Sequence, residues 1–508
     1  ADDIISEPYA KGRKFTSRPD DPYNKVTIES LSGDLQLFDG RMNHNNGWFV
    51  LRSNIKPGVT KGAVKWIITP NVVADWMYQP VIQTSQIGYH PAQDKEAVIE
   101  MDIRDNRKET AQIIRIDADG EKVVKNVTPA NWGKFLRYNY LKVDFTDVKE
   151  PGLYKIKYDT SVSPIFRIDN DVYARGVWQP VLEYFLPVQM CHMRVNEKYR
   201  VWHDCCHMDD AQMAPAHNHI DGYDQKEGLS KFKPGEVVPG VNIGGWHDAG
   251  DFDLRIESQA GESYILALAY EAFHPNLDVT SIDQINRVTE IHQPDGKNDL
   301  LQQVENGALT VVNGYLALGR LYRGIICNDL RQYVLLGDAA AMTDGKIGNE
   351  DDRWIFTEDN PGRELSTAAQ LAAVSRVLKG FNDTLSVHCL DIARKVYAST
   401  GNGNNRALFP KVQAAVELYL TTGEQPYMDF ILDNKELIIK QIGRIGWYTA
   451  RVEKQFAQMK NKKAKAFSTA FRKALTGYEQ ELNKQVQETP YGIPYRPHIW
   501  GAGWDIQR

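Results

Sequence analysis

The chain has 508 residues, of which 42% are hydrophobic and 25% are charged, and its formal net charge is −6 at pH 7. This length suggests two or three domains with a large apolar core, and the composition excludes a disordered or membrane-embedded protein. The negative charge argues against a nucleic-acid partner held through phosphates. The sequence contains no run of about 20 apolar residues, so no membrane span is predicted.

The first 168 residues predict β-structure. The segment "GLYKIKYDT" alternates polar and apolar residues as a half-buried strand does, and Asp119 with Gly120 between two β-branched runs predicts a hairpin. Similar segments follow one another closely enough for a sandwich of seven or more strands over residues 80–168. Residues 1–79 predict a separate β-rich extension.

The apolar period becomes helical from about residue 169, without alternation of strands and helices. Residues 169–508 therefore predict an all-helical part. The basic run "KNKKAKAFSTAFRKAL" also has helical spacing and predicts a solvated helix face. Four apolar stripes support the helical prediction: Ile265, Leu268, Ala269 and Ala272; Leu301, Val304, Ala308, Val311 and Tyr315; Leu385, Cys389, Ile392 and Val396; Val412, Ala415, Val416 and Tyr419.

The stretch "GGWHDAGDFDLR", from Gly244 to Arg255, places two aspartates three residues apart behind two glycines. Helix capping explains one aspartate but not the pair. Two carboxylates on one tight turn can instead share a water molecule, one as its base and the other as an orienting acceptor. They cannot be the acid and base of an inverting glycosidase by themselves, because those groups face each other across roughly 6.5–9.5 Å.

These residues resemble glycoside hydrolase family 9, the inverting endoglucanases with an (α/α)6 barrel. "GGWHDAGDF" is similar to the base motif of the family, and "SQIGYHP" is similar to the start of the immunoglobulin-like module that precedes many of its catalytic domains. The segments "DGKNDLLQQVENGALTVV" and "YGIPYRPHIWGAGWDIQR" resemble further family segments. The resemblance implies a multidomain fold, with an Ig-like β-sandwich over 80–168 and an (α/α)6 barrel over 169–508 that is incomplete at its C-terminus.

The resemblance also implies cleavage of internal β-1,4-glucosidic bonds in cellulose, mixed-linkage glucan or xyloglucan. Asp251 is the expected general base and Asp248 its partner in holding the water. Trp246 and Trp500 are the expected substrate-binding residues, since aromatic faces stack on sugar rings. The acid of the family is a glutamate further downstream. We therefore expect this acid and the last barrel helices beyond Arg508, in a C-terminal fragment that stays bound non-covalently.

Cys191, Cys206, His207 and His247 are the candidate metal ligands. "MCHMR" and "WHDCCHMDDA" are similar to family segments that hold structural zinc, and two thiolates with two imidazoles suit a closed tetrahedral site without room for a catalytic water. The alternative is that the cysteines are buried thiols and the histidines surface groups. Whether Cys205 or Cys206 is the ligand stays open, and the calcium that the family also binds has no recognisable ligands.

Residues 212–243 are a long insertion that could close one end of a cleft, or could be a surface loop of no consequence. The insertion makes an exo-acting β-glucosidase or glucosaminidase of the same fold one alternative function. A non-catalytic glycan-binding fragment is the other alternative, because this sequence lacks the acid. The start at Ala1, without Met, predicts a mature form that is secreted, periplasmic or at the cell surface after removal of a signal peptide.

Overall fold

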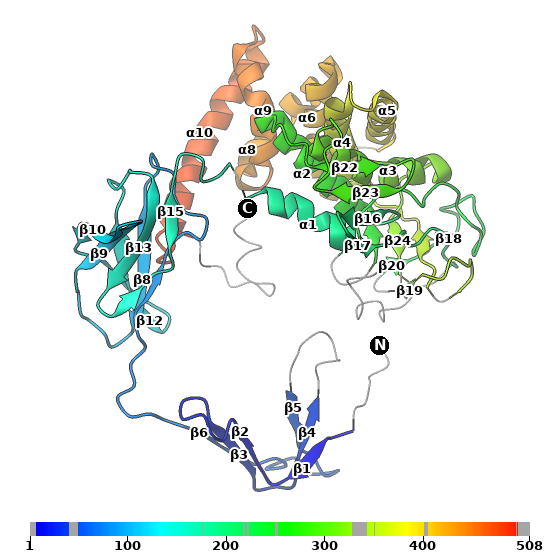
Figure 1. Ribbon diagram of the computed structural model, residues 1–508. Coiled ribbons are helices and arrows are strands. Elements are labelled where there is room, and N and C mark those ends of the chain that lie inside the picture. Colours follow the sequence, from blue (N-terminus) through cyan, green and yellow to red (C-terminus); the bar gives the residue numbers. More distant parts are fainter. Residues whose placement is uncertain are drawn as a thin grey trace.

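The computed structural model describes residues 7–39, 49–174, 176–216, 219–220, 223–248, 252–327, 343–349, 351–400, 405–493 and 495. From the N-terminus it has two small sheets, a β-sandwich and a larger part built mostly of helices (Figure 1). Strands therefore come before most of the helices along the chain, as the change in apolar period predicts.

The two small sheets each have three antiparallel strands, in the orders β1-β4-β5 and β2-β3-β6. They lie apart from the sandwich in Figure 1, and apolar side chains such as Ile68 and Val72 are exposed on them or beside them. The strands are β1 (Ala10–Gly12), β2 (Lys14–Ser17), β3 (Val26–Ser30), β4 (Leu35–Asp39), β5 (Phe49–Arg52) and β6 (Trp66–Pro70).

Two sheets form the sandwich, one in the order β10-β9-β13-β14 with β15 also paired to β13, the other in the order β11-β12-β8-β7. Their inner faces enclose a core that includes Ile99, Ile113 and Ile156, all fully buried. The predicted hairpin is confirmed, because Asp117 and Gly120 pair at the tip of β9 and β10. The strands are β7 (Val81–Gln83), β8 (Glu96–Asp102), β9 (Ala111–Asp117), β10 (Gly120–Val127), β11 (Ala130–Phe135), β12 (Tyr138–Asp144), β13 (Gly152–Tyr158), β14 (Ser161–Val162) and β15 (Phe166–Ile168).

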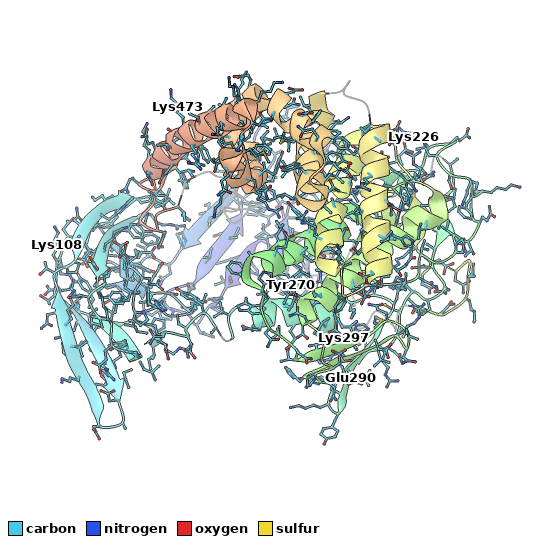
Figure 2. The ribbon with its side chains drawn as sticks, turned by 90° about the horizontal axis from the view of Figure 1, so that it is seen from above. Lys108, Lys226, Tyr270, Glu290, Lys297 and Lys473 are labelled. Atoms are coloured by element: carbon cyan, nitrogen blue, oxygen red, sulfur yellow. The ribbon has the colours of Figure 1, made fainter. Side chains whose placement is uncertain are left out.

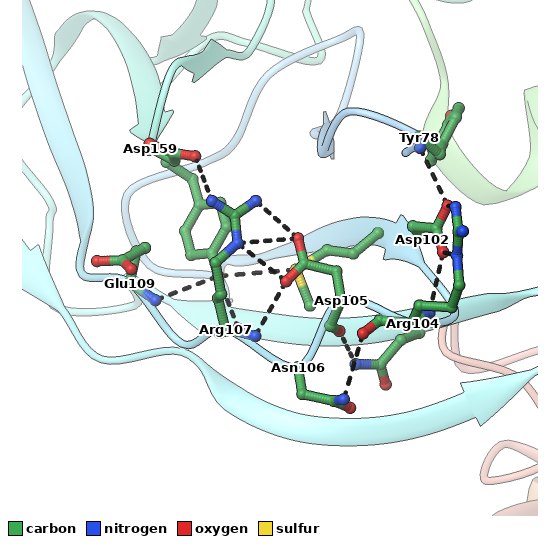
Figure 3. A network of polar contacts seen from close by, with 11 residues as sticks. Tyr78, Asp102, Arg104, Asp105, Asn106, Arg107, Glu109 and Asp159 are labelled. Atoms are coloured by element: carbon green, nitrogen blue, oxygen red, sulfur yellow. Dashed lines mark hydrogen bonds and ion pairs between the residues drawn. The ribbon is translucent and has the colours of Figure 1, made fainter. Parts of the chain in front are cut away.

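A network of arginines and aspartates fixes the loop between β8 and β9 (Figure 3). Arg104 donates to the two carboxylate oxygens of Asp102 at 2.9 and 3.0 Å. Arg107 donates to Asp105 at 2.8 Å and to Asp159, just after β13, at 3.0 Å. Asp105 is 3% exposed, and the bond from Arg107 to Asp159 ties the loop to the end of β13.

The larger part combines helices with short strands, so the prediction of an all-helical part is wrong in this respect. In the sheet β17-β16-β23-β22, strands β16 and β23 pair in parallel, and β18 and β25 do so in the sheet β18-β25-β24-β21. Both pairs join segments far apart in the sequence, which periodicity does not reveal. The strands are β16 (Arg194–Glu197), β17 (Arg200–His203), β18 (Gln212–Met213), β19 (His219–Ile220), β20 (Tyr223–Asp224), β21 (Leu254–Arg255), β22 (Thr280–Asp283), β23 (Val288–Ile291), β24 (Gly324–Ile326) and β25 (Trp354–Phe356).

Three of the four predicted apolar stripes are buried, in α3, α5 and α6, with Tyr315 half-buried at the end of the first of these. The stripe predicted for α2 lies on the wrong face of the helix, because Ile265 is 60% exposed whereas Gln259 and Tyr264 face the core. Within the described ranges, none of the helices has the length and apolar character that crossing a bilayer needs. The helices are α1 (Gln179–Gln189), α2 (Ile256–Phe273), α3 (Asp299–Leu318), α4 (Pro361–Leu378), α5 (Asp383–Ser399), α6 (Asn405–Thr422), α7 (Gln425–Asp433), α8 (Lys435–Lys440), α9 (Ile442–Gln458) and α10 (Lys462–Gln485).

An ion-pair network around one buried glutamate joins α2, α4, α6 and α9. Glu417 of α6 is fully buried and accepts hydrogen bonds from Arg376 of α4 at 2.8 Å and from Arg451 of α9. The hydroxyl of Tyr264 in α2 donates to the same carboxylate at 2.7 Å. Glu271 of α2 accepts from both arginines, at 2.6 and 2.8 Å. Every charge in the network therefore faces an opposite charge, which makes its burial tolerable.

Helix α10 and the segment after it connect the helices to the sandwich, and α10 contains the basic run predicted to be helical. Seen from above, α10, which carries Lys473, extends toward the sandwich, which carries Lys108 (Figure 2). The hydroxyl of Tyr491 donates to Glu100 of β8 at 3.3 Å, and the ring of Tyr495 lies 5.2 Å from that of Phe135. These contacts attach the sandwich directly to the end of the helical part.

We predict that Glu417→Ala lowers the free energy of unfolding by about 3–5 kcal/mol, because only Glu271 then balances the two arginines of the network. Glu436→Ala is the matched control, since its side chain is 86% exposed and its loss costs less than about 1 kcal/mol. Urea unfolding followed by tryptophan fluorescence measures both variants. Equal midpoints would show that the network does not hold the helices together.

Candidate catalytic turn and metal centre

The turn that begins at Gly244 lies directly against helix α3. Gly244 and Gly245 have φ angles of 64° and 88°, in the left-handed region that favours glycine. A Cβ atom on Gly244 would lie 2.2 Å from the carbonyl oxygen of Asn306, so no side chain fits there. The amide of Gly245 donates to the same carbonyl at 3.0 Å. The two glycines therefore serve both the conformation of the turn and its packing on a helix.

Trp246 lies beneath the turn and not on its surface. It is 2% exposed, and a Cβ on Gly307 of α3 would lie 2.4 Å from one of its ring carbons. Gln259 of α2 accepts from the amide of Trp246 and donates to its carbonyl, each at 2.8 Å. This burial corrects the prediction that Trp246 binds substrate, because no ring face is open to a sugar. Trp500, the other predicted substrate-binding residue, lies outside the described residues.

The structure brings Cys191, Cys206, His207 and His247 together in one buried cluster, with one ligand atom of each lying within 4.8 Å of the others. The Sγ atoms of Cys191 and Cys206 are 3.9 Å apart. Sγ of Cys206 lies 3.6 Å from Nε2 of His247, and Sγ of Cys191 lies 3.9 Å from Nδ1 of His207. In tetrahedral zinc with ordinary bond lengths, two sulfurs lie ~3.8 Å apart and a sulfur and a nitrogen ~3.6 Å apart. The donor set and its spacing therefore fit zinc.

Cys205 lies outside the cluster, because its Sγ faces the carbonyl oxygen of Arg287 at 3.8 Å. The geometry therefore selects Cys206 from the two adjacent thiols. His207 and His247 are 1% and 3% exposed, so the alternative of surface histidines is wrong. Burial lowers the pKa of both rings, which keeps them neutral and leaves each with a nitrogen lone pair for a metal.

The segment after α1 pairs with the turn and thereby assembles the cluster. The amide of His247 donates to the carbonyl of Gln189 at 2.6 Å, and the amide of Cys191 donates to the carbonyl of Gly245 at 3.0 Å. His247 directly precedes Asp248 in the sequence. An ion held by the cluster would therefore be fixed relative to the catalytic turn.

Asp248 is the described member of the predicted catalytic pair, whereas Asp251 lies outside the described residues. The Oδ2 atom of Asp248 lies 3.0 Å from Nε of Arg255, and its amide donates to the carbonyl of Asp253 at 2.8 Å. Asp253 is 1% exposed and accepts from the amide of Cys327 at 2.7 Å. Asp253 thus anchors the turn from inside, while Arg255 orients the Asp248 carboxylate.

The insertion at 212–243 reaches this turn. Tyr223 is 4% exposed, and the guanidinium carbons of Arg255 and Arg323 lie 5.7 and 4.6 Å from its ring centre. Strand β18, also in the insertion, pairs with β25 in the sheet β18-β25-β24-β21. This part of the insertion is therefore packed against the residue that holds Asp248, and it is not an isolated surface loop.

A cavity of about 570 Å³ lies at the first residues of α2 and α4. Glu257 of α2 forms part of its wall and pairs with Arg363 of α4 at 2.9 Å and with Arg323. Glu257 is two residues from Arg255, which holds Asp248, so the cavity is close to the predicted chemistry. The sequence pattern does not reveal this charged wall, because an acidic residue in the first turn of a helix is an ordinary feature.

Glu262 of α2 adds a second carboxyl near Asp248. Burial and the charge of Asp248 raise the pKa of Glu262 to about 7. Its Oε2 atom is buried without a hydrogen-bond partner in the part of the chain that the structure describes. In the sequence Glu262 looks like any other glutamate on a helix, so no local signal could have identified it.

Two further groups of potential metal ligands occur among the described residues, and both consist of aspartates. Asp209 belongs to both, with Asp210 and Asp352 in one group and Asp344 and Asp351 in the other. Oxygen ligands of this kind suit calcium, for which the sequence predicts no ligands. Asp210 already forms a fully buried ion pair and is committed to the fold.

Two family models match this chain. The model of glycosyl hydrolase family 9 matches residues 181–504, and the model of the cellulase N-terminal Ig-like domain matches residues 77–163. The first match covers well over half of the chain. The family predicted from the motifs is therefore confirmed, together with its Ig-like module.

Two curated relatives are endoglucanases. A xyloglucan-specific endo-beta-1,4-glucanase of Bacteroides ovatus is 24% identical over 455 residues, which cover 83% of this chain and 72% of that enzyme. Endoglucanase D of Acetivibrio thermocellus is 19% identical over 378 residues, which cover 70% of this chain and 54% of that enzyme. The chain thus spans only about half the length of the second relative.

Solved structures show the same fold. A metagenome-derived glycoside hydrolase family 9 endoglucanase aligns with a TM-score of 0.59 and 20% identity, covering 82% of this chain and 75% of that chain. A zinc-binding triple mutant of another family 9 endoglucanase aligns with a TM-score of 0.56 and 20% identity, covering 78% of this chain and 72% of that chain.

We predict that Glu262→Gln raises Tm at pH 8 by roughly 2–4 °C and leaves it unchanged at pH 4. The folded chain holds the Glu262 proton up to about pH 7, whereas the unfolded carboxyl loses it near its ordinary value of 4.5. Wild-type stability therefore falls as the pH rises between these values, and glutamine removes that loss. Calorimetry across this range is the measurement, with the exposed Glu479→Gln as control. A difference independent of pH would contradict the assignment.

Proposed function

The chain belongs to glycosyl hydrolase family 9, and we propose that it is an inverting endoglucanase. It cleaves internal β-1,4-glucosidic bonds of a β-glucan, with cellulose, mixed-linkage glucan and xyloglucan as the candidate polymers. The observation that carries this proposal is the ion pair in which Arg255 holds the Asp248 carboxylate, next to the cavity at α2 and α4. The activities of the two endoglucanase relatives support the same substrate class. Because such polymers lie outside cells, the protein acts at or beyond the cell surface.

In the proposed mechanism, Asp251 takes a proton from the attacking water while Asp248 holds that water in place. The ion pair with Arg255 gives the Asp248 carboxylate a fixed orientation. A glutamic acid outside the described residues protonates the leaving oxygen on the other side of the bond. Glu262, whose pKa is about 7, carries a proton below that pH, so Asp248 is not opposed there by another full charge.

We also propose that the helices belong to an (α/α)6 barrel over residues 169–508, after an Ig-like sandwich over 80–168 and an extension over 1–79. The cavity supports this arrangement, because its wall includes the first residues of α2, α4 and α6. Every second helix of such a barrel runs in the same direction, so alternate helices begin at the same end. A substrate site at that end would be lined by the first turns of several helices.

The cluster of Cys191, Cys206, His207 and His247 is the proposed site of one structural zinc ion. Two thiolates would balance the charge of the ion, and four protein ligands leave no open position for a catalytic water. A zinc-binding triple mutant of a family 9 endoglucanase has a similar fold, so a scaffold of this kind can hold zinc. A metal held by these four residues would contribute rigidity to the turn and would take no part in the hydrolysis.

An exo-acting β-glucosidase or glucosaminidase is the second candidate function. The observation that favours it is the insertion at 212–243, whose Tyr223 packs beside Arg255. A wall at this position would admit only the end of a glucan chain. The size of the released products separates the two candidates.

We predict that Asp251→Asn and Asp248→Asn each lower kcat/KM by about 10²–10⁴-fold, as removal of a general base or its partner does. Asp391→Asn, on the exposed face of α5, is the control and keeps wild-type activity. Activity is measured on the full natural gene product and its variants with a panel of β-glucans. The products are sized by chromatography. A ladder of oligosaccharides supports the endoglucanase, whereas single sugars support the exo-acting enzyme. Full activity of Asp251→Asn would overturn the mechanism.

The adjacent cysteines provide a matched test of the zinc site. We predict that the unmodified chain and Cys205→Ser retain about one zinc per chain after dialysis, whereas Cys206→Ser retains almost none, because only Cys206 lies in the cluster. Elemental analysis gives the stoichiometry, and a thermal melt of each protein shows the lost stabilisation. Loss of zinc from Cys205→Ser alone would contradict the geometry.

A further inference from the structure

Arg353 is a fully buried arginine directly before strand β25, and it lies between the metal cluster and the catalytic turn. Its Nη2 atom donates to Sγ of Cys191 at 3.2 Å and lies 3.3 Å from Nε2 of His192. Its Nη1 atom donates to the carbonyl oxygen of Phe252 at 2.5 Å. One planar guanidinium thus contacts a candidate metal ligand and the backbone of the turn at the same time.

The contact with His192 extends this arrangement to the other end of the turn. Nδ1 of His192 lies 2.8 Å from the carbonyl oxygen of Gly244. A neutral ring that donates from Nδ1 accepts at Nε2, which matches the position of Arg353. The segment between Gly244 and Phe252 is therefore held at its start through His192 and at its end by Arg353 directly. His247, in the middle of the same segment, belongs to the cluster.

The charge of Arg353 is balanced by Asp210, whose side chain is also fully buried. Asp210 accepts from the amide of Arg353 at 2.9 Å and from Nε of its guanidinium. A buried ion pair adds little net stability compared with apolar packing, but the rigid fork of arginine fixes the direction of each hydrogen bond. Such a group is therefore suited to setting geometry.

We propose that Arg353 is a positioning residue that clamps both ends of the catalytic turn to the Cys191–Cys206–His207–His247 cluster, and so couples metal binding to the placement of Asp248. This inference rests on the proposed zinc site and the proposed hydrolysis. The hydrogen bond from Arg353 contacts Cys191, a candidate metal ligand. Hydrogen bonds to metal ligands affect the affinity for the metal and the orientation of the ligand. The bond to Phe252 acts on the residue next to Asp251.

The test uses the full chain with Arg353→Lys, which keeps the positive charge but cannot contact Cys191 and Phe252 together. Arg376→Lys is the control, because Arg376 is a largely buried arginine, 14% exposed, that belongs to the ion-pair network between the helices. Both variants are compared for thermal stability, release of zinc to a chelator, the thiolate-to-cobalt absorption of the cobalt-substituted protein, and kcat and KM.

We expect Arg353→Lys to release zinc at least about 10-fold faster, to shift the thiolate-to-cobalt band, and to lower kcat about 10-fold with little change in KM. Arg376→Lys is expected to lose stability without any change in the cobalt spectrum. A zinc-loaded Arg353→Lys with unchanged spectrum, release rate and kcat would overturn the inference. Absence of zinc from the unmodified chain would instead overturn the zinc proposal itself.

Hydrogen exchange of the unmodified protein provides a second test that does not depend on the folding of the variant. If Arg353 couples the two regions, removal of the metal speeds exchange in peptides covering both 252–256 and 353–357, while α10 is unaffected. Faster exchange in 252–256 with no change in 353–357 would show that the turn responds without Arg353, and would overturn the proposal.

Discussion

The close approach of the Gly244 backbone to helix α3 is the constraint on which the whole site depends. A side chain there would collide with the carbonyl oxygen of Asn306, so the chain can pass only as glycine in a left-handed conformation. The residues that follow then point in fixed and different directions. Trp246 fills the space under the turn, His247 reaches the metal cluster, and Asp248 meets an arginine beyond it. The position of Asp248 is thus a consequence of backbone packing.

Buried charge provides the second level of order. Arg353 with Asp210, and Glu417 with its two arginines, place ions where apolar residues of similar size would be at least as stabilising. What the ions add is direction, because each must meet a partner at hydrogen-bond distance. The network around Glu417 aligns the helices, and Arg353 aligns the turn with the cluster. The site is therefore positioned by polar contacts set inside an apolar framework.

Local patterns in the sequence were sufficient for much of this structure. The sandwich hairpin, the buried stripes of α3, α5 and α6, and the four clustered ligands were all predicted from spacing or from the family motifs. The prediction for α2 failed because that helix buries polar side chains such as Gln259, which bonds to the backbone of Trp246. Glu262 and Arg353 were not identified, because their importance depends on partners far away in the sequence.

Two separate elements act on Asp248 from different sides. The metal cluster acts through the backbone, since His247 is the preceding residue, and the insertion acts through Arg255, beside which Tyr223 packs. A change in the cluster would move the turn as a whole, whereas a change in the insertion would act on the Asp248 carboxylate through Arg255. The turn and the carboxylate that it carries are therefore held by two separate sets of contacts, one from the cluster and one from Arg255 and the insertion.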